Sequence, residues 1–238
     1  MGGEARADTD TQTRTFAWPA VRAVRIDGTI AQVRVLGSAR KDISVEITRE
    51  APTRADLERL PIAWDEAEGT LAVTALQADD GKDPRIHARI VVSVPAEVPI
   101  ESLHVFEGLV ALEGLGGGVS VTIERGDVTA RGLGGAVRLE TLIGNITVTD
   151  LVPERITKLH CRLFNGSATV ALDAPPRDAR ILLLTLNGKV VTNLPVNERS
   201  SFGPRFAEAT LGRGEPVYSV DVVRGDITFR AAGVRPPR

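Results

Sequence analysis

The sequence has few of the residues that build metal centres, disulfides or redox sites. Its 238 residues include one cysteine, Cys161, together with three histidines, one methionine and one tyrosine. A single cysteine excludes both an intramolecular disulfide and a thiolate cage made by one chain. His87, His104 and His160 have no further His or Cys at the spacing that zinc ligands need. We therefore expect no metal site, and nothing in the sequence indicates a cofactor.

An excess of one charge and long apolar runs are also missing. The chain has 29 Lys and Arg against 31 Asp and Glu, a formal net charge of -2, and the two signs are interspersed. It therefore lacks the basic patch of a nucleic-acid-binding protein, and we expect no nucleic-acid partner. No stretch reaches the roughly 18 apolar residues of a membrane helix. The polar start MGGEARADTDTQTR has no signal-peptide core, so either the protein is cytosolic or its export signal or anchor lies outside this chain.

Strand-forming alternation dominates what is present. Hydrophobic residues make up 42% of the chain, and β-branched residues recur at every second position in short runs separated by turn residues. Such runs predict strands around residues 21–26, 30–35, 43–47, 70–76 and 86–94. The segment from Thr53 to Leu60 is the one helical candidate, because Thr53 can cap it and Pro61 ends it.

A glycine-centred repeat fills the second half of the chain. Six segments combine a glycine with a short alternating strand: EGLVAL (107–112), RGDVTA (125–130), IGNITV (143–148), NGSATV (165–170), NGKVVT (187–192) and RGDITF (224–229). Their glycines are Gly108, Gly126, Gly144, Gly166, Gly188 and Gly225, at intervals of 18, 18, 22, 22 and 37 residues. Internal periods near 20 residues are typical of stacked architectures. The sequence therefore predicts an all-β fold, a β-solenoid with coils of about 18–22 residues.

Stacking accounts for both the glycines and the strands between them. One such unit cannot bury an apolar face alone, but layered units place like side chains in columns. A tight corner needs φ > 0, which costs a residue with a Cβ about 1–2 kcal/mol, so we expect the six glycines to be structural turn residues. The residues expected to point inwards are Val119, Val121, Ile123, Val128, Val137, Leu139, Ile146, Val148, Val170, Leu172, Val190, Ile227 and Phe229.

The last interval, from Gly188 to Gly225, is too long for one coil. We expect either an inserted loop at Val196 to Pro216 or a coil whose turn signal has been lost. The expected domain organisation is a disordered tail (1–15), a β-rich N-terminal part continuous with the solenoid (16–100), the solenoid repeats (101–232) and a second tail (233–238).

The chain resembles the adhesin-like β-strand-repeat families of bacteria, which are largely of unknown function and are sometimes described as an autotransporter-adhesin head. The resemblance rests on VRIDGTIAQVRV, VSVPAEVPIESLHV and the glycine series above, and it covers roughly residues 20–232. It implies an exported or membrane-anchored protein without catalytic residues, located in the periplasm or at the cell surface. It provides no functional site to carry over.

Two groups that could carry chemistry are better explained as structure. His160 and Cys161 are adjacent, so on a strand they point to opposite faces and cannot act as base and nucleophile. Asp79, Asp80 and Asp83 lack the alternating oxygen ligands of a helix-loop-helix calcium site, which favours a solvated hairpin loop.

The acidic turn residues Asp127 and Asp226 could form the carboxylate pair of a sugar-cleaving enzyme. Both follow a repeat glycine, however, where short polar side chains satisfy turn backbone groups. The same position accounts for the two Arg-Gly-Asp triplets, at 125–127 and 224–226. We predict no catalytic residue.

The sequence favours a non-enzymatic β-solenoid that binds or scaffolds at the bacterial cell envelope. Its partner would be an unknown protein or glycan, and open strand edges make self-association a further expectation. One alternative is a scaffold that polymerises end to end, as bactofilins do. The other is a carbohydrate-active β-helix enzyme.

Overall fold

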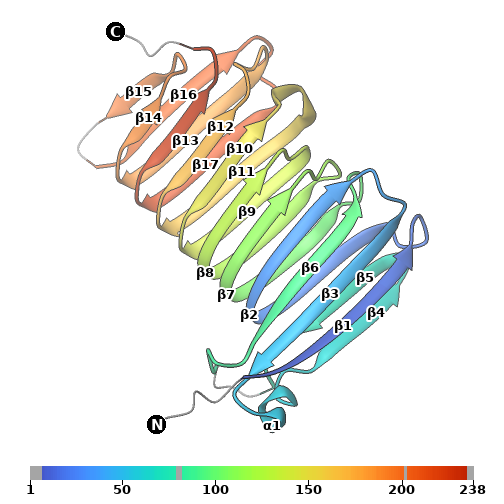
Figure 1. Ribbon diagram of the computed structural model, residues 1–238. Helices are drawn as coiled ribbons and strands as arrows, with labels where there is room; N and C mark the ends of the chain where they lie inside the picture. The colour runs from blue at the N-terminus through green and yellow to red at the C-terminus, as the bar shows by residue number, and fades with distance from the viewer. Residues whose placement is uncertain (1–6, 79–81, 201–202, 235–238) are drawn as a thin grey trace.

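The chain folds mainly into β-strands, so the all-β prediction is confirmed. The computed structural model describes residues 7–78, 82–200 and 203–234 (Figure 1). These residues include the short helix α1 (Arg54–Leu57) and the 3-10 turn η1 (Pro153–Arg155). The strands are β1 (Asp8–Ala17), β2 (Ala23–Ser38), β3 (Asp42–Ala51), β4 (Ile62–Ala67), β5 (Thr70–Ala75), β6 (His87–Pro95), β7 (Ile100–Glu113), β8 (Val119–Arg131), β9 (Gly135–Ile143), β10 (Ile146–Leu151), β11 (Ile156–Asn165), β12 (Ala168–Leu172), β13 (Ala179–Asn187), β14 (Val190–Thr192), β15 (Asn197–Ser200), β16 (Arg205–Leu211), β17 (Val217–Arg224) and β18 (Ile227–Ala231).

The strands form one 18-stranded mixed sheet that bends into two walls. In β8, residues 119–125 pair with β9, whereas residues 128–131 pair with β10. The long strands β2 and β7 bend in the same way and belong to both walls. Wall A runs β4-β5-β2-β7-β8-β9-β11-β17-β13-β16-β15. Wall B runs β1-β3-β6-β2-β7-β8-β10-β12-β18-β14.

The core lies between the two walls. Along β8, Val119, Val121 and Ile123 are buried and the intervening Thr122 is exposed. All the residues that we expected to point inwards are buried except Val190, which is half-buried. Each fully buried Val, Leu or Ile side chain contributes about 1.5–3 kcal/mol relative to an exposed one. These columns of aliphatic side chains hold the walls together.

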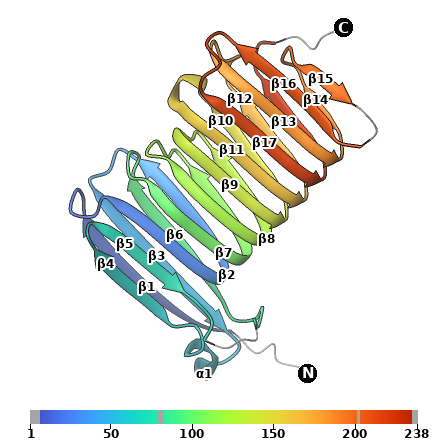
Figure 2. The same cartoon turned by 180° about the vertical axis from the view of Figure 1, so that it is seen from behind.

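The C-terminal strands do not stack in chain order. β17 lies between β11 and β13, and β18 lies between β12 and β14. The last two strands of the chain are thus inserted between strands that precede them in sequence (Figures 1 and 2). The region from Val196 to Pro216, where we expected a loop or a lost coil, holds β15 and β16. These two strands are antiparallel to each other, and β16 continues wall A antiparallel to β13.

At the other end of the molecule, the expected N-terminal tail is partly wrong. Residues 8–15 form most of β1, which pairs with β3 from Asp8 to Ala17. Threonine occupies positions 9, 11, 13 and 15, and β-branched threonine favours a strand even where it stays exposed. The segment has no apolar alternation because it is an edge strand, so the pattern that reveals buried strands is absent.

A half-buried guanidinium ties β1 to the short helix. The Arg49 side chain is 13% exposed and donates to the carbonyl oxygens of Leu57 and Leu60 at 3.1 and 2.8 Å. Its Nε also donates to Asp10 Oδ2 at 3.1 Å, and this bond lowers the pKa of the Asp10 carboxyl. The expected N-cap is present, since Thr53 Oγ1 accepts from the Asp56 backbone N–H at 3.2 Å.

Candidate functional site

The six repeat glycines form one column at the corner between the walls. A Cβ built on Gly126 would lie 1.8 Å from the Gly108 carbonyl oxygen, and one on Gly144 would lie 1.9 Å from that of Gly126. Their φ angles are 140° and 146°. At these two positions glycine is therefore required both by the backbone angle and by the close approach of the strand below. The expected positive φ is wrong for Gly188, where only the close approach of a Cβ to the Gly225 carbonyl oxygen, at 1.9 Å, requires glycine. From the β2 end, the order in the column is Gly108, Gly126, Gly144, Gly166, Gly225 and Gly188.

A ladder of polar side chains runs beside this column. The Asn145 backbone N–H donates to Asp127 Oδ1 at 2.7 Å, and the Ser167 N–H donates to Asn145 Oδ1 at 3.0 Å. The Lys189 N–H likewise donates to Asp226 Oδ1 at 2.8 Å. Each side-chain oxygen thus accepts a hydrogen bond from a backbone N–H of the neighbouring corner rather than of its own turn. These hydrogen bonds join successive corners.

Asp127 and Asp226 are not brought together. Asn145 and Ser167 lie between them on the ladder, so three strand spacings of about 4.8 Å put them about 14 Å apart. Paired carboxylates of glycosidases lie within roughly 9.5 Å of each other. These two residues therefore do not form a shared catalytic pair.

The neighbours His160 and Cys161 point to opposite faces of β11, as expected. Cys161 is fully buried, and burial raises the pKa of its thiol to about 12. His160 is on the outer face, with Nε2 3.8 Å from Glu140 and Nδ1 3.9 Å from Asp221. Because a thiol must ionise to react as a nucleophile, Cys161 is inert in the folded protein.

We expect Cys161 to react with a thiol reagent such as DTNB at pH 8 at least 100-fold more slowly in native protein than in denaturant. The unfolded thiol ionises near its ordinary pKa of 9.0 and the folded one does not. The free energy of unfolding should therefore fall as pH rises above 9, because only the unfolded chain then loses this proton. Rapid native labelling at one equivalent would contradict this burial.

Metal binding finds no support in the described parts of the chain. No group of three His, Cys, Asp or Glu side chains there could hold an ion. Asp79 and Asp80 of the acidic loop lie outside the described residues. Asp83 is paired with Arg85, whose guanidinium lowers the pKa of the carboxyl to about 2. Across residues 7–78, 82–200 and 203–234, no helix has the length and apolar character needed to cross a bilayer.

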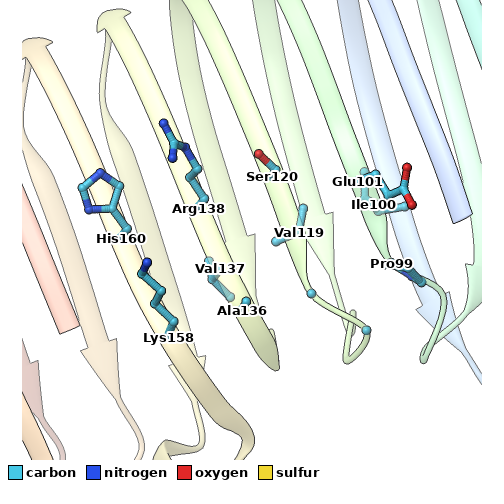
Figure 3. A pocket seen from close by; sticks show the side chains of 12 residues that line it. Pro99, Ile100, Glu101, Val119, Ser120, Ala136, Val137, Arg138, Lys158 and His160 are labelled. Atoms are coloured by element: carbon cyan, nitrogen blue, oxygen red, sulfur yellow. The ribbon is translucent and has the colours of Figure 1, made fainter. Parts of the chain in front are cut away.

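A groove of about 480 Å³ crosses the outer face of wall A. It lies at the ends of β7, β8, β9 and β11, beside the glycine-rich turns that precede β8 and β9 (Figure 3). Small residues leave the space, among them Gly117, Gly118 and Ala136. Polar side chains surround it: Glu101, Ser120, Arg138, Lys158 and His160.

The groove carries more positive than negative side chains. Its lining contains two cationic side chains, Arg138 and Lys158, but a single acid, Glu101. The Glu101 carboxylate is already bound by Arg25 at 2.8 Å, and Arg138 binds Glu140 at 2.8 Å. Lys158 has no ion pair within the described part of the chain. Its ammonium is thus left to interact with a ligand, and the groove suits an anionic group.

Two other depressions do not combine an excess of basic side chains with a cation that has no ion pair. One, of about 410 Å³, lies on wall B beside Arg34 and Arg131, and these arginines face Glu113 and Asp150 as ion-pair partners. The other, of about 260 Å³, lies on wall A beside Leu142 and Phe164. Leu142 is 49% exposed and Phe164 46%.

Sequence reasoning did not find the groove. Its residues are spread over four strands between positions 99 and 160, and each polar one occupies an ordinary solvent-facing position. Arg138, for example, occupies an outward position on β9. A signal was available in a second glycine-containing repeat, LGGGV (115–119) and LGGAV (133–137). This repeat places small residues beside the groove.

The chain shares its fold with a candidate cell adhesion protein from Clostridium sporogenes. The TM-score is 0.54 at 11% sequence identity, over 94% of this chain and 100% of that chain. The adhesin resemblance seen in the repeats is thereby confirmed for the fold. A candidate adhesin from Bacteroides fragilis is less similar, with a TM-score of 0.33 at 12% identity, over 93% of this chain and 97% of that chain. No family model and no curated protein matches the sequence.

Proposed function

We propose that the protein is a non-enzymatic, adhesin-like β-solenoid module of the bacterial cell envelope, and that its wall A groove binds an acidic glycan. The observation that carries the proposal is the groove itself. It is open, it spans four parallel strands, and it is lined by Arg138, Lys158 and His160. Four strands at about 4.8 Å spacing span about 15 Å, enough for a few sugar units.

The chemistry of the groove favours a carboxylated polysaccharide. Arg138 and Lys158 can bind carboxylates by charge-assisted hydrogen bonds, while Ser120 can bind sugar hydroxyls. The exposed backbone at Gly117 allows close approach of a sugar ring. Since the site is open to solvent, its electrostatic part should weaken as ionic strength rises.

The rigidity of the strands that form the groove supports a role in displaying a binding surface. β7, β8, β9 and β11 are hydrogen-bonded to one another in wall A, so most of the groove is built on ordered strands rather than on a mobile loop. The separation of Asp127 from Asp226 and the burial of Cys161 support a non-enzymatic role. The fold shared with a candidate cell adhesion protein supports a place at the cell envelope.

A combined glycan-array and polysaccharide-degradation screen tests the proposal. We expect binding to uronate-containing or sialylated glycans, weaker binding at high salt, and no cleavage. Turnover of any bound polysaccharide would establish the carbohydrate-active alternative. Binding restricted to neutral glycans, or none to any glycan, would contradict the role assigned to the basic groove.

A further inference from the structure

One of the sheet's edges differs from the others. Within the described residues, four strands pair with a single neighbour: β1, β4, β14 and β15. β14 has three residues, β15 has four and β4 has six, whereas β1 has ten. A short edge exposes few unpaired N–H and C=O groups, but ten residues expose them along about 33 Å.

The β1 edge carries the charged residues Asp8, Asp10 and Arg14 but lacks other features that block strand pairing. It contains no proline and no lysine, and its register with β3 continues from Asp8 to Ala17 without a bulge. Its threonines at positions 9, 11 and 13 are exposed. Such a regular, polar strand can accept another strand beside it.

In antiparallel orientation β1 is complementary to itself. When two copies are centred on Gln12, residues whose numbers add to 24 lie opposite each other. Asp10 of each copy then faces Arg14 of the second copy. Arg49 and Gln12 bind Oδ2 of Asp10, so among the described contacts Oδ1 is left to accept from that arginine. Even-numbered residues also face even-numbered ones, which keeps both faces of the sheet in register.

We infer that the protein forms a two-fold symmetric dimer by antiparallel β1–β1 pairing, which joins wall B of two copies into one sheet. Because the two-fold contact uses the β1 edge of both copies, neither β1 edge is left to bind a third copy. The other edges, β4, β14 and β15, have only six, three and four residues, so assembly stops at the dimer. The inference goes beyond the proposed function and does not depend on it, since the groove lies on wall A.

Cross-linking of the full chain tests the register directly. In the dimer, Gln12 lies opposite Gln12 of the second copy, and directly opposite residues have Cα atoms about 4.5–5.5 Å apart, within disulfide range. The Gln12→Cys variant should form a covalent dimer on mild oxidation. Thr9→Cys is the matched control, because Thr9 lies opposite Thr15 and about 20 Å from its own equivalent. Native Cys161 is buried and contributes no link.

Sedimentation of the wild type and two charge variants tests the pairing energetically. Thr11 lies opposite Thr13 of the second copy, so Thr11→Lys with Thr13→Lys should raise the dimer dissociation constant at least tenfold. Thr11→Glu with Thr13→Lys should leave it within about threefold. Both variants lose the same Thr11–Thr48 hydroxyl contact of 3.0 Å, so a general effect on β1 would move them together.

Three results would overturn the inference. The first is a wild type that stays monomeric up to several hundred micromolar. The second is equal cross-linking of the Thr9→Cys and Gln12→Cys variants. The third is a series of species larger than the dimer, which would indicate end-to-end polymerisation instead.

Discussion

Deleting residues 217–238 is expected to unfold β13 to β16 rather than to shorten the stack by one layer. The deletion removes β17 and β18, which lie between β11 and β13 and between β12 and β14. It also removes the buried side chains of Tyr218 and Phe229 and the Tyr218 hydroxyl bond to the Pro153 carbonyl at 3.2 Å. β13 then loses its parallel neighbour and its core contacts while remaining in the chain.

Hydrogen exchange compared with a longer deletion measures this effect. Removing residues 174–238 should leave β1 to β12 as protected as in the full chain, apart from the new edge at β11 and β12. Removing only residues 217–238 should give the same protected region and add an unprotected, protease-sensitive segment at 174–216. Native-like protection of residues 179–187 in the shorter deletion would mean that β13 does not depend on β17.

Replacing Gly144 by alanine is expected to destabilise the protein by about 3–5 kcal/mol. The backbone angle alone costs a residue with a Cβ about 1–2 kcal/mol. In addition, the new Cβ would lie 1.9 Å from the Gly126 carbonyl oxygen, so two corners must separate and lose backbone contacts. Urea unfolding of the purified variant gives the free energy of unfolding directly.

Gly134→Ala is the matched control for this substitution. Gly134 lies near the opposite corner, and a Cβ there would be 3.4 Å from the nearest heavy atoms. Gly134 is buried, but its added Cβ would make only ordinary van der Waals contacts and its φ is not positive, so we expect a change below about 1 kcal/mol. Equal stabilities of the two variants would show that the glycine column is not under the constraint described.

The repeat reveals the corners and the core of this fold but not the order of its layers. Gly126 and Gly144 mark corners because a missing Cβ and a positive φ leave a trace in a single sequence. The insertion of β17 beside β11 leaves none, since any strand with the same alternation could take that place. β4 was also missed, because its outward residues are exposed and its inward residues only partly buried.

The candidate site is less visible in the sequence than the fold. Arg138 and Lys158 are 20 positions apart and become neighbours only through the pairing of β9 with β11. Packing does not constrain outward positions. A basic residue at such a position therefore gives the same sequence pattern whether it binds a ligand or only water. Histidine and cysteine are easier to assess, because adjacency on a strand fixes their faces, as His160 and Cys161 show.

Titration of an oligogalacturonate into the protein, followed by isothermal calorimetry, tests the groove assignment most directly. The account predicts binding that falls at least tenfold in the Arg138→Glu, Lys158→Glu double variant. Binding should be unchanged in the Arg34→Glu, Arg131→Glu variant, which alters the wall B depression by the same charge. Undiminished affinity in the first variant, or a loss confined to the second, would contradict the assignment of ligand binding to wall A.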